Sequence, residues 1–174
     1  MFPSLRGNGA IQGLKKHHHL IAWTALAVVA LDQITKLAIV HSLRMYDSVT
    51  VVKGFFNLFH VRNRGIAFGM MNQHHIGLTF YFLVAVSLGA IALLLFWSLR
   101  LKESDTLTCV GLSLILGGAI GNLLDRIRLK EVIDFLDFYF GAYHWPAFNL
   151  ADSAITVGTL GVAITLFFHR SSNE

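Results

Sequence analysis

Two aspartates, Asp134 and Asp152, have the residue type and the setting to do chemistry. Asp134 lies beyond the third apolar segment of the sequence, and Asp152 lies at the start of the fourth, flanked by Asn149 and Ser153, which could orient it. Two carboxylates brought close together cannot both ionise cheaply, so one keeps a proton. One could then deprotonate a water while the other protonates a peptide carbonyl oxygen, as in the aspartic-protease dyad. The spacing alone leaves open a simpler role for each, as a helix N-cap or an interfacial charge.

Asp32 and Lys36 are an acid and a base four residues apart within an apolar segment. On a helix this spacing places them on one face, with the acid first, which is the favourable order. Ionisable groups inside an apolar span are rare and are expected to be paired or functional. We interpret these two as an internal ion pair that fixes the first helix to its neighbours. A role in a proton or ion relay is the alternative.

A second polar group ends the third apolar segment. Asn122 and Asp125 are three residues apart and share a helix face, whereas Arg126 points elsewhere and needs a separate partner. We interpret them as helix-end hydrogen-bonding groups that shape a site. Upstream, Gly117 and Gly121 form a pair of small residues that lets another helix approach closely, and their bare backbone could also admit a bound peptide.

Asn63, Arg64 and Gly65 lie between the first two apolar segments. Asn63 could donate a hydrogen bond to a peptide backbone or to an aspartate of the dyad, and Gly65 would permit a tight turn. Arg62 and Arg64 could contact lipid phosphate, because guanidinium suits bidentate phosphate contacts. An ordinary turn with solvated arginines explains the same residues.

The composition indicates an integral membrane protein. Of 174 residues, 55% are apolar and 14% are charged, which is too apolar for disorder or for the surface of a soluble globule. The net charge of +4 suits contact with anionic lipid headgroups and is too small and scattered to indicate nucleic-acid binding. There is one cysteine and no paired Cys and His pattern typical of zinc. We interpret the run His17–His19 as a surface feature.

The apolar segments predict four membrane-spanning helices. They lie at about 20–40, 76–99, 106–124 and 150–168, each long enough to cross the hydrocarbon core. Four spans place both termini on one side and the connections 41–75 and 125–149 on the other. Residues 49–52 and 55–61 are β-branched and aromatic, which predicts a small hairpin or sheet in the first connection, whereas the second connection is rich in aromatics that favour the membrane interface. We therefore expect one all-α membrane domain over residues 1–174, with a small β element. Basic residues are balanced between the two sides, so they do not fix the orientation.

Five blocks in this order resemble the bacterial lipoprotein signal peptidases, the signal peptidase II family. The resemblance rests on Asp32-Gln33-Ile34-Thr35-Lys36, Asn63-Arg64-Gly65-Ile66-Ala67-Phe68, Gly117 through Arg126, Val132-Ile133-Asp134-Phe135 and Phe148-Asn149-Leu150-Ala151-Asp152-Ser153-Ala154. The second block departs from the usual Asn-x-Gly-Ala-Ala/Ser-Phe at Ile66, which could narrow a substrate groove.

The resemblance implies an aspartic endopeptidase that cuts diacylglyceryl-modified prolipoproteins just before the lipidated cysteine. It implies catalytic residues at Asp134 and Asp152. Supporting or substrate-binding positions are Asp32, Lys36, Asn63, Arg64, Gly65, Gly118, Asn122, Asp125, Arg126, Asn149 and Ala151. The implied partners are membrane lipids, the signal peptides of diacylated prolipoproteins and inhibitors of the globomycin type. We expect no metal and no cofactor, because a dyad activates water unaided.

The same resemblance implies a multi-pass protein of the bacterial inner membrane, with cytoplasmic termini and a periplasmic active site. On this view the signal helix enters between the spans, where Gly117, Gly118 and Gly121 could make room for it. Two other functions remain open from the residues alone. A proton- or ion-coupled transporter would use Asp32, Lys36 and Asp152 as a relay, and a non-catalytic assembly factor would use the glycines and aromatics for partner contacts.

Overall fold

Four long helices and a small sheet make up the protein, for which a computed structural model describes residues 7–65, 76–101 and 106–171. The helices are α1 (Gly7–Ser42), α2 (Ile76–Ser98), α3 (Thr106–Leu129) and α4 (Leu150–Ser171). In each, a stretch is long and apolar enough to cross a membrane, beginning at His17 in α1. This confirms the predicted fold class, although α1 and α3 extend beyond the spans expected from the sequence.

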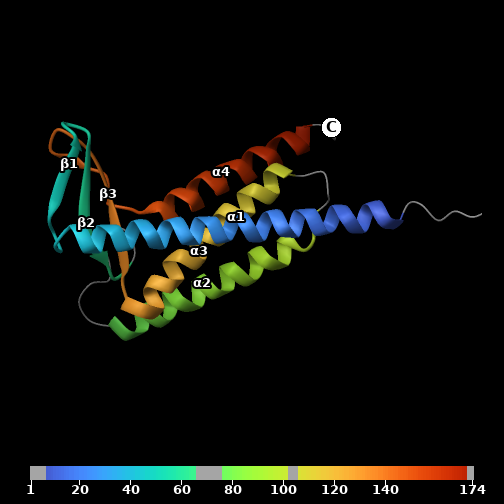
Figure 1. Cartoon of the computed structure of the whole chain (residues 1–174), viewed down its shortest axis with the longest axis horizontal. Helices are drawn as coiled ribbons and strands as arrows, with labels where there is room; N and C mark the ends of the chain where they lie inside the picture. The colour runs from blue at the N-terminus through green and yellow to red at the C-terminus, as the bar shows by residue number, and fades with distance from the viewer. Residues whose placement is uncertain (1–6, 66–75, 102–105, 172–174) are drawn as a thin grey trace, which may run out of the picture.

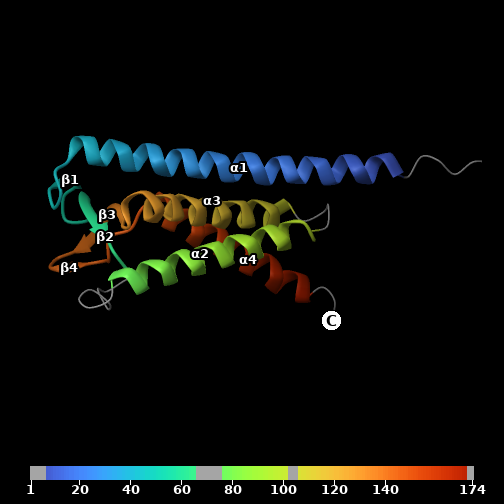
Figure 2. The same ribbon diagram turned by 90° about the horizontal axis from the view of Figure 1, so that it is seen from below.

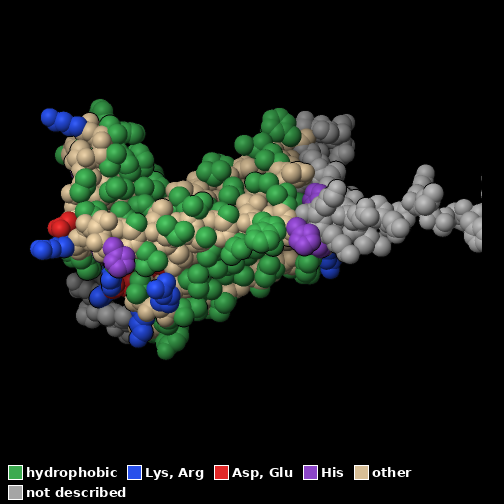
Figure 3. Space-filling view, viewed as in Figure 1, with side chains coloured by type: hydrophobic (Ala, Val, Ile, Leu, Met, Phe, Trp, Pro, Cys, Tyr) green, Lys and Arg blue, Asp and Glu red, His purple; other side chains and the backbone are tan. Residues whose placement is uncertain are grey.

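Helix α3 is the centre of the bundle. In its most apolar stretch 61% of the residues are buried in the molecule, against 11% in α2. Figure 2 shows α1 on one side of α3, with α2 and α4 on the other. The outer faces of α1, α2 and α4 are covered with exposed hydrophobic side chains, which Figure 3 shows for one side of the molecule. An apolar outer surface of this kind is suited to lipid rather than to water.

The sheet closes one end of the bundle, and both helix ends nearest the chain termini lie at the opposite end (Figure 1). Its strands are β1 (Ser48–Val52), β2 (Phe56–Asn63), β3 (Val132–Phe140) and β4 (Tyr143–His144), paired antiparallel in the order β1-β2-β3-β4. The hairpin of β1 and β2 is the one predicted from the first connection. The prediction was incomplete for the second connection, since it contributes β3 and β4 to the same sheet.

Two glycines with positive φ make the tight turns of this sheet. Gly54 (φ 81°) joins β1 to β2, and Gly141 (φ 59°) joins β3 to β4. Only glycine adopts this backbone conformation without a steric penalty. Between the turns, Phe138 stacks on Phe56 at 4.7 Å and on Phe148 at 5.8 Å between ring centroids, which fixes the middle of the sheet against the chain that enters α4.

The interface between α3 and α4 depends on two glycines that meet. A Cβ built on Gly158 would lie 2.5 Å from the carbonyl oxygen of Gly111, and one on Gly111 would lie 2.7 Å from Val162 Cγ2. Small residues at a helix crossing let the backbones approach closely in a membrane. At the far end of the bundle His17 Nδ1 lies 3.0 Å from Cys109 Sγ, so His17 is half-buried, unlike the exposed His18 and His19.

We predict that Gly158→Ala destabilises the protein by about 1–3 kcal/mol, because the new methyl group meets backbone that cannot move aside. Gly161→Ala is the matched control on the same helix, since a Cβ there meets nothing within 4 Å. Thermal unfolding in detergent measures both. Equal transition temperatures for the two variants would contradict the close packing.

Candidate active site

Asp152 lies in the first turn of α4 and is held there by Asn149. The backbone N–H of Asp152 donates to Asn149 Oδ1 (2.9 Å), and the backbone N–H of Asn149 donates to Asp152 Oδ2 (3.3 Å). This is the reciprocal arrangement of a capping box, in which Asn149 is the N-cap residue. The other oxygen of Asp152 accepts a hydrogen bond from Asn122 Nδ2 (2.8 Å). Both carboxylate oxygens of Asp152 are therefore oriented by neighbouring donors.

Asp134 lies in β3 and is 3% exposed. Its Oδ1 accepts a hydrogen bond from Asn149 Nδ2 (2.8 Å), and its Oδ2 accepts one from Asn63 Nδ2 (3.1 Å). Asn63 is itself fixed, because its Oδ1 accepts the backbone N–H of Gly65 (3.0 Å) in the bend after β2. The expectation that Asn63 hydrogen-bonds an aspartate of the pair is confirmed, whereas Gly65 lies in a bend without the positive φ that a tight turn would require of glycine.

Asn149 joins the two aspartates, because its side chain donates to Asp134 and its backbone N–H donates to Asp152. The sheet explains this placement. The backbone N–H groups of Phe135 and Leu136 both donate to the carbonyl oxygen of Phe148, at 2.9 and 2.8 Å. The residue after Phe148 is thereby brought alongside β3, at the point where α4 begins.

The environment of Asp134 favours its protonated form. Burial, and then the charge of Asp152, raise the pKa of Asp134 from 3.8 to about 7. The hydrogen bonds from Asn63 and Asn149 act in the opposite direction, since they stabilise the carboxylate. Near neutral pH a substantial fraction of Asp134 therefore keeps its proton, so this carboxyl is available as a general acid.

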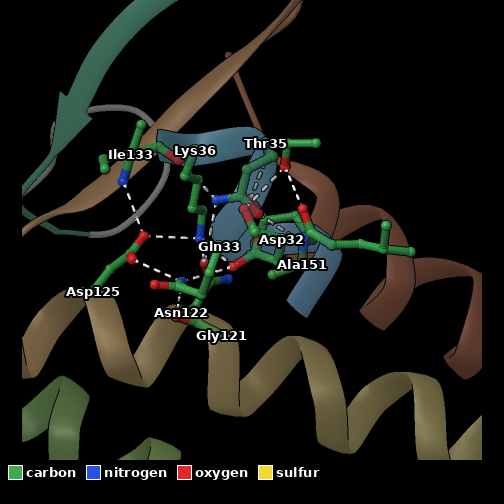
Figure 4. A network of polar contacts seen from close by, with 12 residues as sticks. Asp32, Gln33, Thr35, Lys36, Gly121, Asn122, Asp125, Ile133 and Ala151 are labelled. Atoms are coloured by element: carbon green, nitrogen blue, oxygen red, sulfur yellow. Dashed lines mark hydrogen bonds and ion pairs between the residues drawn. The ribbon is translucent and has the colours of Figure 1, made fainter. Parts of the chain in front are cut away.

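A buried charge network lies beside the aspartate pair and ties α1 to α3 (Figure 4). Lys36 Nζ lies 2.8 Å from Asp32 Oδ2 and 2.8 Å from Asp125 Oδ2, and these three side chains are at most 2% exposed. The predicted ion pair of Asp32 and Lys36 is confirmed, and Asp125 is its third member. The lysine is paired with a carboxylate on each of the two helices, so the network is suited to fixing α1 against α3.

The network extends to the aspartate pair through three contacts. Lys36 Nζ donates to Asn122 Oδ1 (3.0 Å), and Asn122 in turn holds Asp152. The backbone N–H of Ala151 donates to Asp32 Oδ1 (3.0 Å), and that of Ile133 donates to Asp125 Oδ2 (3.3 Å). The N–H of Ala151 belongs to the first turn of α4, where such groups have no partner within the helix. Each aspartate of the pair thus sits next to a backbone group anchored on the network.

Sequence reasoning missed Gln33 as a contributor to this network. Its Nε2 donates to Asp32 Oδ2 (3.1 Å), Asp125 Oδ1 (3.0 Å) and the carbonyl oxygen of Gly121 (3.3 Å), and its Oε1 accepts from Arg128 (3.2 Å). The sequence did offer one indication of this role, because Gln33 directly follows an aspartate inside an apolar segment. Its other partners lie far along the chain, so spacing could not identify them.

The glycines of α3 do not leave room for a bound peptide, which corrects that expectation. A Cβ on Gly118 would collide with the carbonyl oxygen of Ala151 in α4, and one on Gly121 would lie 2.6 Å from Asp32 Oδ2. A Cβ on Gly117 would lie 2.7 Å from Val28 Cβ in α1. The protein's own helices fill this space, so these glycines and Ala151 serve the close approach of α1, α3 and α4.

Two arginines of the expected site have partners within the protein. Arg64 Nε donates to Glu131 Oε1 (2.5 Å) at the surface, with Arg62 3.6 Å from the same carboxylate. Arg126 is half-buried and donates to the carbonyl oxygen of Asn122 (3.2 Å). Ile66 lies outside the described residues. Within the described ranges, no three His, Cys, Asp or Glu side chains gather closely enough to hold a metal ion.

These features define a class of protein. It is a multi-pass membrane protein with two carboxyls paired at the end of the helix bundle that the sheet closes. The family model described as "Signal peptidase (SPase) II" matches residues 24–168. Curated relatives named "Lipoprotein signal peptidase" include one from Syntrophus aciditrophicus, 43% identical over 88% of this chain and 95% of its own, and one from Desulforapulum autotrophicum, 44% identical over 82% and 88%. A solved structure of a bacterial membrane enzyme, determined by the in meso method at 2.3 Å resolution, is similar with a TM-score of 0.79, 30% identity and coverage of 88% of this chain and 91% of that one. The chain belongs to the signal peptidase II family.

Family membership makes this protein a membrane peptidase. Membership of a peptidase family argues against the two alternative functions that the residues alone had left open, a transporter and a non-catalytic assembly factor.

We predict that Lys36→Met lowers the free energy of unfolding by about 3–5 kcal/mol, because Asp32 and Asp125 would be left buried without their counter-charge. Lys53→Met, at the exposed turn between β1 and β2, is the control for loss of a lysine. Unfolding in detergent measures both variants. A Lys36→Met protein as stable as the control would contradict the role of the network.

We predict that Asp134 titrates near pH 7 and that Asp152→Asn lowers this midpoint while leaving it above 3.8, since the like charge is lost but the burial remains. Isotope-edited infrared spectroscopy of the aspartate carboxyl bands measures the midpoint. A midpoint near the ordinary value in the unmodified protein would contradict the account of the site.

Proposed function

We propose that this protein is an aspartic endopeptidase that removes the signal peptide from diacylglyceryl-modified prolipoproteins, cutting just before the lipidated cysteine. The observation that carries the proposal is the carboxyl pair itself: Asp134 is buried with its pKa raised to about 7, Asp152 is half-buried, and Asn149 holds both. The name of its curated relatives, lipoprotein signal peptidase, supports the substrate class.

The proposed reaction begins with Asp134 protonated and Asp152 ionised. Asp152 takes a proton from a water molecule, whose oxygen attacks the carbonyl carbon while Asp134 gives its proton to the carbonyl oxygen. The tetrahedral intermediate then breaks its C–N bond as Asp152 passes its proton to the leaving nitrogen. The hydroxyl formed on the carbonyl oxygen returns a proton to Asp134, so the pair ends as it began.

The surrounding residues act in this reaction by holding the two carboxyls still. Asn63 and Asn149 fix Asp134, and Asn122 and Asn149 fix Asp152. Asp32, Lys36 and Asp125 tie α1 to α3, and the backbone N–H groups of Ala151 and Ile133 attach the starts of α4 and β3 to these carboxylates. Holding a catalytic group in the correct orientation lowers the activation free energy of the reaction, because the conformational entropy of that group is already lost before the substrate binds.

The setting of the pair suits a substrate anchored in a membrane. Asp152 begins a membrane-spanning helix, and Asp134 lies in the sheet that closes the same end of the bundle (Figure 1). A bond next to a lipid-bearing cysteine lies at this depth. We place the protein in the bacterial inner membrane with cytoplasmic termini and the sheet on the periplasmic side. Lipids would cover its apolar faces, and globomycin-type inhibitors would block the aspartate pair.

We predict that Asp134→Asn and Asp152→Asn each reduce cleavage at least about 100-fold, because each removes one arm of acid–base catalysis. The assay follows a diacylated prolipoprotein in detergent. Asp47→Asn, which changes an exposed aspartate at the same end of the molecule, is the control and is expected to keep full activity. Substantial cleavage by either variant of the pair would refute the assignment.

A further inference from the structure

A pocket separate from the aspartate pair lies on the sheet. It has a volume of about 650 Å³ and is lined by side chains of β1, β2, β3 and the segment 143–147. Neither Asp134 nor Asp152 belongs to it. Its polar lining includes Ser48, Asn57, Asp137 and His144, and its larger rings are Phe59, Tyr143 and Trp145.

The polar side of this pocket is a buried carboxylate with two donors. Asp137 is 6% exposed, and its Oδ2 accepts a hydrogen bond from Asn57 Nδ2 (2.9 Å). His144 Nδ1 lies 2.8 Å from Asp137 Oδ1, and the imidazole ring stacks on Tyr139 with 5.0 Å between centroids. The phenol of Tyr139 is in turn held by the backbone N–H of Gly54 (2.9 Å). The group is therefore fixed in place before any ligand arrives.

This group has more acceptors than donors. A carboxylate offers about four acceptor positions, and Asp137 accepts one hydrogen bond from Asn57 and one from His144, whose Nδ1 lies near both oxygens. Asn57 Oδ1 is also buried, and among the described residues it has no hydrogen-bond partner. The acceptor positions of Asp137 that remain open make the pocket complementary to a ligand that brings N–H groups.

The walls favour a ligand that also carries positive charge. Tyr143 and Trp145 are 68% and 59% exposed, and their rings line the same pocket as the carboxylate of Asp137. The faces of aromatic rings attract cations, and the cation found there is most often an arginine side chain. A guanidinium group combines a planar face with several N–H donors in a fork, so it can contact Asp137 and an aromatic ring together.

We propose that this pocket is a specificity subsite that takes an arginine side chain from the polar segment of the substrate, on the water side of the cleaved bond. The proposal rests on the proposed peptidase function. Asp137 follows Asp134 by three residues on the same strand, or about 10 Å along an extended chain. The same distance corresponds to about three residues of an extended substrate. A buried carboxylate suits the polar segment, because the apolar signal helix lies in the membrane.

The test compares arginine with citrulline, which has the same shape and no charge. Diacylated substrates carry one or the other at each position from the second to the fifth after the lipidated cysteine. We expect kcat/KM to favour arginine at one of these positions by about tenfold, the size of one charge-assisted hydrogen bond. Equal rates for the two residues at every position would overturn the proposal, whatever the variants do.

The variants identify the pocket as the source of the preference. Asp137→Asn is expected to bring the arginine-to-citrulline ratio close to one, while Asp47→Asn, which removes an exposed charge from the same end of the molecule, keeps it. A ratio that survives in Asp137→Asn would overturn the proposal, as would equal losses on both substrates, since those indicate a structural role.

Binding separates this proposal from the proposed function. Short peptide amides of the segment after the cysteine, with arginine or citrulline, are titrated into the Asp152→Asn protein by calorimetry. Tighter binding of the arginine peptide, lost in the Asp137→Asn/Asp152→Asn protein, supports the pocket even if the unmodified protein cleaves nothing. Cleavage without an arginine preference supports the peptidase and overturns the pocket.

Discussion

The position of Lys36 between Asp32 and Asp125 is the interaction on which the rest of the structure depends. Charges inside an apolar bundle are stable only when they are paired and hydrogen-bonded, and this lysine lies 2.8 Å from each carboxylate. The pairing fixes α1 against α3. Through the backbone N–H of Ala151 and the side chain of Asn122 it also fixes the beginning of α4. Asp152, in the first turn of that helix, is therefore positioned by charges that lie outside the aspartate pair.

The aspartate pair shows how a membrane protein can keep two carboxyls close together. Asp134 comes from the sheet and Asp152 from a helix start, so each has its own set of donors, and Asn149 connects them. Burial and the neighbouring charge raise the pKa of Asp134 to about 7, so a substantial fraction of it keeps its proton at neutral pH. The sheet that closes the bundle is therefore part of the site, because β3 positions Asp134 and also aligns the chain that leads into α4.

Local patterns in the sequence predicted much of this architecture. Hydropathy identified the four spans, the i, i+4 spacing identified the pair of Asp32 and Lys36, and β-branched residues identified the first hairpin. Strands β3 and β4 were missed because their aromatic residues are equally typical of a membrane interface. The contacts of Gln33 and the packing of Gly118 against Ala151 depend on residues distant in the chain, which spacing cannot reveal. The same is true of the pocket around Asp137, whose partners come from two separate connections.

The central claim is that Asp134 and Asp152 act on one substrate carbonyl. Its most direct test is an experimental structure of the protein with a lipidated peptide in which the scissile amide is replaced by a hydroxyethylene group, which resembles the tetrahedral intermediate. The account predicts that this hydroxyl lies within about 3.2 Å of one carboxyl oxygen of Asp134 and one of Asp152. A hydroxyl bound away from either aspartate, with the peptide fully ordered, would contradict it.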